Sequence, residues 1–165
     1  MTDHDLTITI SVDKTSKEAY DAINNVRGWW SEEVNGGTEK LYDEFTYKAR
    51  ALHRCTLKLT EVVPNQKVVW LVLENYFKFT QDTTEWTGTT ISFEISEKNG
   101  KTQLVFTHHG LTPEYECYDI CNDGWTNYIQ HSLASLITTG KGTPNAAGKP
   151  KTEHEEKLSA NQEQL

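Results

Sequence analysis

The fold is decided by two neighbouring stretches, TGTTISFEISEKNGKTQLVFTHH at residues 87–109 and TPEYECYDICNDGWTNYIQHSLASLITTG at residues 112–140. In the first stretch, apolar and polar residues alternate on both sides of Asn99-Gly100, a pair that is the strongest short-range signal for a β-hairpin turn. The alternation predicts two antiparallel strands that face the interior through residues such as Phe93 and Phe106.

The second stretch predicts a long closing helix. Its apolar residues recur at helical spacing over about six turns. Thr112 is a suitable N-cap, Pro113 suits the first helical turn, and Gly140 ends the pattern. We therefore expect a helix from Thr112 to Thr139 that is long enough to cover one face of a sheet.

The first thirty residues predict one strand followed by one or two short helices. Residues 6–12 alternate strictly between apolar and polar types, as in a half-buried strand. Thr15 and Glu18 have the spacing of a capping box, and the helical pattern after them stops near Gly28.

The middle of the chain predicts antiparallel strands at residues 45–49, 53–63 and 68–73. The third is continuously apolar, which is typical of a central strand that is covered on both faces or borders a cavity. Residues 75–86 are predicted as a loop between strands. Because strands and helices are segregated rather than alternating, the predicted class is α+β: a curved antiparallel sheet wrapped around a long C-terminal α-helix, with two short helices after the first strand.

The composition limits the classes of partner. The chain has 165 residues, a mean hydropathy of -0.66 and a net charge of -8 from 16 basic and 24 acidic residues. Nucleic-acid affinity comes mostly from Lys and Arg, so this balance argues against nucleic acid and equally against anionic membranes. No apolar run approaches a membrane span, and the acidic residues 1–5 do not resemble a signal peptide, so we expect a cytoplasmic protein. Residues 1–142 are expected to form one domain, and the polar residues 143–165 a disordered tail.

Motifs for catalysis, cofactors and metals are not evident in the sequence. It contains no nucleophile elbow, phosphate loop or dinucleotide fingerprint, so no cofactor is expected. Three cysteines, Cys55, Cys117 and Cys121, do not form a disulfide framework. Cys117 and Cys121 would share one helix face, but no further ligand pair completes a zinc site, and no metal is expected.

A set of fold motifs spans about residues 5–140: TITISV at 7–12, SKEAY at 16–20, VRGWW at 26–30, LTEVVPNQKVVW at 59–70, GTTISFEI at 88–95, LVFT at 104–107 and GW at 124–125. With these motifs the chain resembles the START-like, helix-grip superfamily (SRPBCC). More narrowly, it resembles the branch named for the C-terminal domain of the activator of the heat-shock protein 90 ATPase. The superfamily is similar in shape to birch-type pollen allergens, lipid-transfer domains and polyketide aromatase/cyclases. The resemblance implies a hydrophobic cavity between sheet and helix, and it supplies no catalytic signature.

Aromatic side chains are the main candidates for a site, because the chain has five Trp, seven Tyr and five Phe in an otherwise polar sequence. In Trp29-Trp30, one ring is expected to pack the helical region on the sheet and the other to line a pocket. Aromatic residues between 75 and 86 either cover a ligand groove or pack at an edge. The predicted ligand-binding residues are Trp30, Trp70, Phe77, Trp86, Phe93, Phe106, His108, Cys121, Trp125 and Tyr128.

His108 has two interpretations. It points inward beside Phe106, where burial lowers the pKa of an imidazole, and it is a candidate for proton transfer. The alternative is a buried histidine that is hydrogen-bonded to Tyr118 or to a backbone carbonyl. General acid–base catalysis usually needs a second positioned group, and no inward Asp or Glu is predicted near it.

Three functions remain open at this point. The first is a protein that binds a small hydrophobic or aromatic molecule in the cavity. The second is a cyclase/aromatase-type enzyme that uses His108. The third is a chaperone-associated interaction module, which is doubtful because the chain has no room for the second domain of the known activator. The ligand, the oligomeric state and the strand register between Trp70 and Trp86 are left undetermined.

Overall fold

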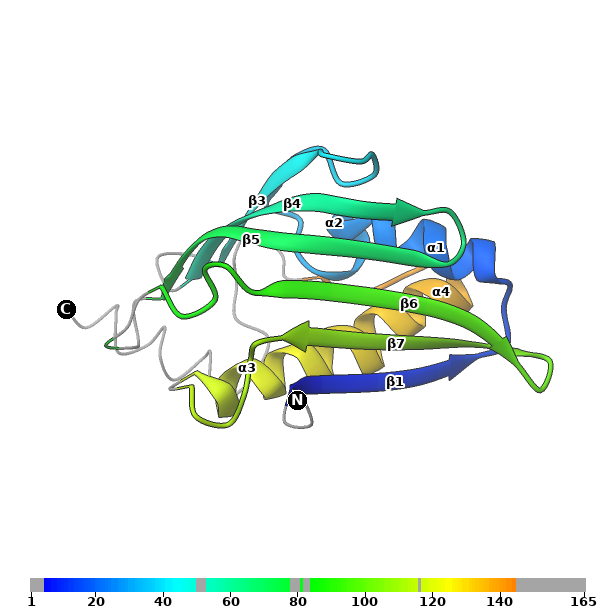
Figure 1. Cartoon of the computed structure of the whole chain (residues 1–165). Coiled ribbons are helices and arrows are strands. Elements are labelled where there is room, and N and C mark those ends of the chain that lie inside the picture. The colour runs from blue at the N-terminus through cyan, green and yellow to red at the C-terminus, as the bar shows by residue number, and fades with distance from the viewer. Residues whose placement is uncertain (1–4, 50–52, 78–80, 82–83, 116, 145–165) are drawn as a thin grey trace.

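The protein folds as a seven-stranded antiparallel sheet that curves around a C-terminal helix (Figure 1). The computed structural model describes residues 5–49, 53–77, 81, 84–115 and 117–144. The spatial order of the strands is β1-β7-β6-β5-β4-β3-β2. Their bounds are β1 Leu6–Val12, β2 Val34–Gly36, β3 Glu44–Ala49, β4 His53–Val63, β5 Lys67–Phe77, β6 Thr90–Lys98 and β7 Lys101–His109.

The helices lie together on one face of this sheet, with α1 and α2 beside the far end of the C-terminal helix (Figure 1). Helix α1 spans Ser16–Asn24 and α2 spans Val26–Trp29. The C-terminal helix is continuous through α3 (Tyr118–Thr126), the π-helical segment η1 (Asn127–Leu133) and α4 (Ala134–Thr139). The α+β, helix-grip prediction is therefore confirmed, including the two short helices after the first strand.

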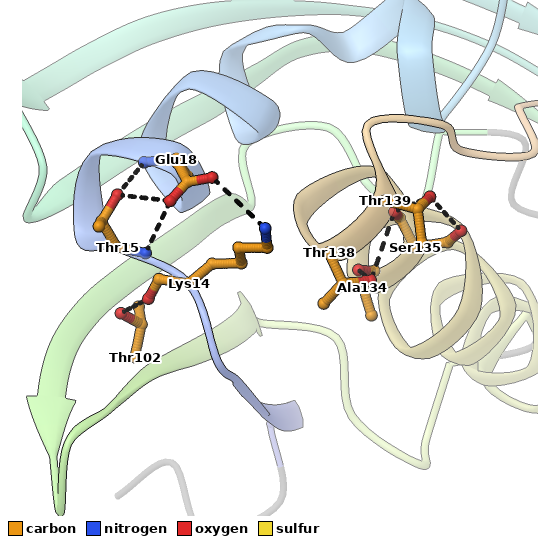
Figure 2. Close-up of polar contacts among 8 residues, drawn as sticks. All are labelled: Lys14, Thr15, Glu18, Thr102, Ala134, Ser135, Thr138 and Thr139. Atoms are coloured by element: carbon orange, nitrogen blue, oxygen red, sulfur yellow. Dashed lines mark hydrogen bonds and ion pairs between the residues drawn. The ribbon is translucent and has the colours of Figure 1, made fainter.

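Local sequence signals account for several element boundaries. Asn99 and Gly100 have φ values of 55° and 78°, as the two central residues of a tight hairpin turn require. Gly140 has φ 82° and ends the C-terminal helix in the left-handed conformation. Thr15 and Glu18 form the predicted capping box at the start of α1 (Figure 2).

Two boundaries differ from the sequence-based predictions. The closing helix begins at Tyr118 and not at Thr112, because residues 113–115 form a turn. In this turn the Tyr115 backbone N–H donates a hydrogen bond to the Thr112 backbone carbonyl. Strand β5 is longer than predicted and extends to Phe77, so the first residues of the predicted loop 75–86 belong to a strand.

Strand β5 is also covered on one face only. Val68, Trp70 and Val72 are buried, whereas Leu71 and Leu73 between and after them are half-buried on the convex side of the sheet. The continuous apolar run therefore reflects a central strand whose outer face is apolar but not covered by a second layer of the described residues.

The interior lies between the concave face of the sheet and the C-terminal helix. The inward residues of β6 and β7 are those predicted, with Phe93 and Phe106 both fully buried. Ser132 on η1 donates a hydrogen bond to the Trp29 backbone carbonyl at 2.7 Å and so ties α2 to the C-terminal helix. In the part of the chain that the structure describes, no helix is both long and apolar enough to cross a membrane.

The chain remains anchored to the domain shortly after Gly140. The backbone N–H of Thr143 donates to the Ser132 hydroxyl at 2.9 Å, so the predicted tail from residue 143 begins at a fixed position. The rest of the predicted tail, residues 145–165, lies outside the described residues.

The capping box gives a test of how α1 is stabilised. We expect Thr15→Ala to lower the free energy of unfolding by about 1 kcal/mol, because the Glu18 backbone N–H loses its acceptor at 3.0 Å. Thr138→Ala is the matched control, since the exposed Thr138 hydroxyl bonds only to backbone carbonyls inside α4 (Figure 2). In urea unfolding, the control substitution should change the free energy of unfolding by less than about 0.5 kcal/mol. Equal effects of the two substitutions would contradict the assignment.

Candidate functional site

A connected network of aromatic and imidazole rings occupies the space between the sheet and the C-terminal helix. Its members come from α2 and the residue that follows it, from five strands, from the segment before β6 and from α3. Each is buried, and each lies within ring-contact distance of at least one other member. We call this set the ring network: Trp29, Trp30, Phe45, Tyr47, His53, Trp70, Phe77, Trp86, Phe93, Phe106, His108 and Trp125.

Trp30 lies at the centre of the network and connects its layers. Its ring stacks on Trp70 of the sheet at 5.8 Å between centroids and on Tyr47 at 4.2 Å. Its other neighbours include Trp125 of the C-terminal helix, at 5.0 Å. Trp29 stacks on the same Trp70 ring at 6.2 Å. Both tryptophans of the Trp29-Trp30 pair therefore pack the helical region on the sheet.

The network ends in a polar region where several strands terminate. We call it the end cluster and define it by His53, Asn75, Phe77, Trp86, Thr89, His108 and Trp125. Strand β5 pairs with β6 only from Lys67 to Leu71, so its last residues extend beyond the first residue of β6. Trp86 and Thr89, from the segment before β6, pack against this end of the sheet.

A β-bulge in β5 determines which side chains enter the end cluster. Val72 pairs with Leu57 and Glu74 pairs with Thr56, so Leu73 has no opposite residue in β4. A bulge shifts the alternation of a strand by one residue. Asn75 and Phe77 consequently point inward. The sequence alone had left the register of this segment undetermined.

His53 and Asn75 form a buried pair across β4 and β5. His53 Nε2 lies 2.8 Å from Asn75 Oδ1. Because the carboxamide oxygen accepts, the proton of this bond belongs to His53 Nε2, and the Asn75 amide nitrogen faces the other way. Burial lowers the pKa of His53 to about 4, although the bond to Asn75 opposes the shift. The imidazole is therefore uncharged at neutral pH.

His108 is held by hydrogen bonds at both ring nitrogens. The Trp125 indole N–H donates to His108 Nδ1 at 3.2 Å, which places the imidazole proton on Nε2. Nε2 then donates to the Thr89 hydroxyl at 2.8 Å, and that hydroxyl donates to the Trp86 backbone carbonyl at 2.6 Å. The pKa of His108 falls to about 3, chiefly through burial and further through its proximity to His109 and His53. These partners differ from the Tyr118 or backbone carbonyl expected from the sequence.

Three buried donors, two in the end cluster and one elsewhere in the ring network, lack an acceptor among the described residues. They are Trp70 Nε1, Trp86 Nε1 and Asn75 Nδ2. The Trp86 indole lies beside the Cys121 sulfur, a weak acceptor, without reaching hydrogen-bond geometry. By contrast, Trp29 Nε1 donates to the Ile23 carbonyl at 3.1 Å. An unmade buried hydrogen bond costs about 1–3 kcal/mol, so these donors need an explanation.

The cysteines have the character of buried thiols. Cys55, Cys117 and Cys121 are all free and buried. Burial raises the pKa of the Cys55 and Cys121 thiols, and the adjacent Cys117 raises that of Cys121 further. Among the described residues, no group of three or more His, Cys, Asp or Glu side chains is placed to hold a metal ion.

Eight of the ten predicted ligand-binding residues belong to the ring network, namely Trp30, Trp70, Phe77, Trp86, Phe93, Phe106, His108 and Trp125. The other two, Cys121 and Tyr128, are buried on the C-terminal helix. Two further aromatic residues fall in the predicted loop 75–86: the side chain of Tyr76 is 38% exposed, and Phe79 lies outside the described residues. Sequence analysis missed His53 and Asn75. The alternation of strand 53–63 places His53 on the same face as Cys55 and Leu57 and could have identified it, whereas the inward direction of Asn75 depends on a bulge that has no local signal.

Two hollows bounded by described residues lie outside the ring network. One, of about 430 Å³, lies between the start of α1 and the β6–β7 hairpin and is lined by charged residues that include Lys14, Glu18, Glu97 and Lys101. The other, of about 300 Å³, lies beside β1 and the same hairpin. Their polar linings do not suit an apolar ligand, so the ring network is the better candidate, and an open cavity within it stays a prediction.

Residues 24–138 match the family described as "Activator of Hsp90 ATPase homolog 1-like protein", and the chain belongs to this family. The family resemblance seen in the sequence is thus confirmed. No curated protein matches the sequence.

Solved structures show the same fold at low sequence identity. The Aha1 dimer from Colwellia psychrerythraea is similar with a TM-score of 0.67 and 21% identity, over 84% of this chain and 98% of that one. DynU16, a putative protein of the dynemicin biosynthetic locus, has a TM-score of 0.61 and 14% identity, over 85% of this chain and 49% of that one. CalU16 from Micromonospora echinospora has a TM-score of 0.57 and 13% identity, over 81% and 74%.

The buried histidines predict acid-sensitive stability. Both pKa values are lowered by folding, so between pH 6.5 and about 4 the unfolded chain binds protons that the folded chain does not, and stability falls as pH falls. Between pH 7 and pH 4.5, each histidine is expected to lower the free energy of unfolding by about 2–3 kcal/mol. Urea unfolding of the protein and of His108→Gln at the two pH values measures this. The variant should lose about half as much stability on acidification as the parent, and an identical loss would contradict the pKa of His108.

Proposed function

We propose that this protein binds a small apolar or aromatic molecule between the curved sheet and the C-terminal helix, at the end cluster. The observation that carries the proposal is the pair of buried donors without acceptors in the end cluster, Trp86 Nε1 and Asn75 Nδ2, with a third, Trp70 Nε1, elsewhere in the ring network. Binding sites for small molecules typically combine apolar walls with a few well-placed polar groups. The ring network supplies the walls, and these donors supply the polar groups.

A purely structural core would have no reason to retain these donors. Phe in place of Trp keeps most of the apolar surface and removes a polar atom whose burial is unfavourable. The same interior satisfies Trp29 and Trp125 with good acceptors, so its geometry does not prevent such bonds. Donors that the protein leaves unpaired are suited to an acceptor supplied by a ligand.

An enzymatic role for His108 is less consistent with the geometry. Both of its ring nitrogens are bonded to protein groups, and its low pKa disfavours the protonated form that a general acid needs. A substrate would have to break a bond to Trp125 or Thr89 to reach the ring. The arrangement favours a positioning role, in which His108 orients the Trp125 ring and the backbone at Trp86.

A chaperone-associated role is the second candidate, because the family is described by its likeness to an activator of the Hsp90 ATPase. The similar structure from Colwellia psychrerythraea is a dimer, which makes self-association an additional proposal for this chain. Neither role uses the unpaired donors in the interior. The binding proposal explains more of the described structure.

Indole proton resonances provide the test, because each of the five Trp side chains gives a separate signal. On titration with a hydrophobic panel of flavone, progesterone and palmitate, we expect the Trp86 or Trp70 indole N–H to move downfield as it gains an acceptor. The Trp29 signal should move less, since its N–H already donates to Ile23. No change for any of these compounds would contradict the proposal.

Two substitutions separate binding from folding. Trp86→Phe keeps an aromatic ring and removes the donor, so affinity for a responding ligand should fall about 3- to 10-fold, as for one neutral hydrogen bond. Trp29→Phe is the matched control: it removes a satisfied donor from a ring that lies outside the end cluster, so it should reduce stability with little effect on affinity. Equal losses of affinity in the two variants would argue against a ligand contact at Trp86.

A further inference from the structure

The end cluster differs from an ordinary apolar pocket in its polarity, because its free groups are donors and they are uncharged. Trp86 contributes an indole N–H and Asn75 an amide N–H, each without an acceptor among the described residues. Trp86 is 4% exposed and Asn75 is 5% exposed, so bulk water does not satisfy them. Both contact His53, Asn75 through a hydrogen bond and Trp86 through an edge-to-face ring contact at 4.7 Å between centroids.

The Asn75 amide is held in one orientation by its environment. His53 Nε2 donates to Asn75 Oδ1, so the amide nitrogen is directed away from the imidazole. The bulge at Leu73 turns the side chain inward, and the backbone of Asn75 is fixed by pairing with Cys55. A donor that is fixed in this way loses little entropy on meeting an acceptor, which favours binding.

Positive charge is not available from the described residues at this site. Every lysine and arginine that the structure describes is exposed or half-buried, and Arg50 and Lys78 lie outside those residues. Arg54, next to His53 in sequence, points outward and lies over the Tyr76 ring at 5.8 Å. His53 itself remains neutral, since burial lowers its pKa to about 4.

A negative charge is present nearby instead. The half-buried carboxylate of Glu85 accepts a hydrogen bond from the Cys117 backbone N–H at 3.1 Å, and it also acts on the Cys121 thiol. An anionic ligand at the end cluster would lose its hydration without a counter-charge and would face this carboxylate. A neutral oxygen acceptor incurs neither cost.

We infer that the end cluster recognises the uncharged carbonyl oxygen of an aromatic ketone or aldehyde and discriminates against aromatic carboxylates. This inference rests on the proposed function, and it specifies the chemical class of ligand for the same site. The rings of Trp86, Trp125 and Phe77 contact the aromatic part of the ligand, and the Asn75 and Trp86 N–H groups donate to its oxygen.

Three ligands with one ring system test this assignment on the unmodified protein: 2-acetylnaphthalene, 2-ethylnaphthalene and 2-naphthoate. Isothermal titration at pH 7.5 should give an affinity for the ketone about tenfold higher than for the ethyl compound, which lacks an acceptor. The carboxylate should bind at least about tenfold more weakly than the ketone. Equal affinity for the ketone and the ethyl compound, or a preference for the carboxylate, would overturn the inference and leave the proposed function standing. Absence of binding by all three would contradict both.

Substitution of Asn75 tests the contact itself. Asn75→Leu should reduce the preference for the ketone over the ethyl compound to about threefold or less, because one donor is lost. Asn24→Leu is the matched control, since Asn24 is also a buried amide but belongs to α1, outside the ring network. It should retain the tenfold preference. If Asn75→Leu does not fold, the Trp86→Phe variant reports on the second donor in the same comparison, and an unchanged preference there would overturn the inference.

Discussion

The stacking of Trp30 between the sheet and the C-terminal helix is the interaction on which the rest of the structure depends. One ring contacts Trp70 in the central strand, Tyr47 in β3 and Trp125 in α3. These three elements are far apart in sequence, and their mutual position sets the width of the interior. Truncation of a buried Trp to Ala typically lowers the free energy of unfolding by about 3–5 kcal/mol, so the packing of this ring is also energetically large. The end cluster is possible because the helix is held at this distance from the sheet.

The bulge in β5 has a comparable effect on chemistry. Without it, the alternation that places Trp70 and Val72 inward would continue to Glu74 and Tyr76. A buried carboxylate would then lie beside His53, and the end cluster would carry a charge. Because Leu73 is unpaired, Asn75 and Phe77 point inward in place of Glu74 and Tyr76, so the interior receives an amide and an aromatic ring. The neutral polarity of the end cluster is thus a consequence of backbone geometry as much as of residue choice.

The sequence predicted the fold well because its signals are local. Strict alternation in residues 6–12, the Asn99-Gly100 turn and the capping box at Thr15 each depend on residues within a few positions of one another. The inward direction of Trp70, Phe93 and Phe106 could also be predicted, since inward positions follow from alternation once a strand is identified.

The site was predicted less completely because its arrangement is not local. His53 meets Asn75 only after two bulges have set the register of β4 on β5. The proton on His108 is placed by Trp125, which comes from the closing helix, and by Thr89, which precedes β6. The start of the closing helix was misplaced for a related reason: Thr112 and Pro113 have good local propensity, but the chain there first turns back from β7.

Burial of two neutral histidines links the acid sensitivity that we predict to the selectivity that we propose for the end cluster. Phe at positions 53 and 108 would avoid the cost of keeping an imidazole uncharged while the unfolded chain takes up protons. The histidines instead give the interior fixed hydrogen-bond directions: His53 turns the Asn75 amide, and His108 fixes Trp125 and the Trp86 backbone. Uncharged partners orient the donors without attracting anions. The property that is expected to make the protein sensitive to acid is therefore the same property that would let the end cluster distinguish a carbonyl from a carboxylate.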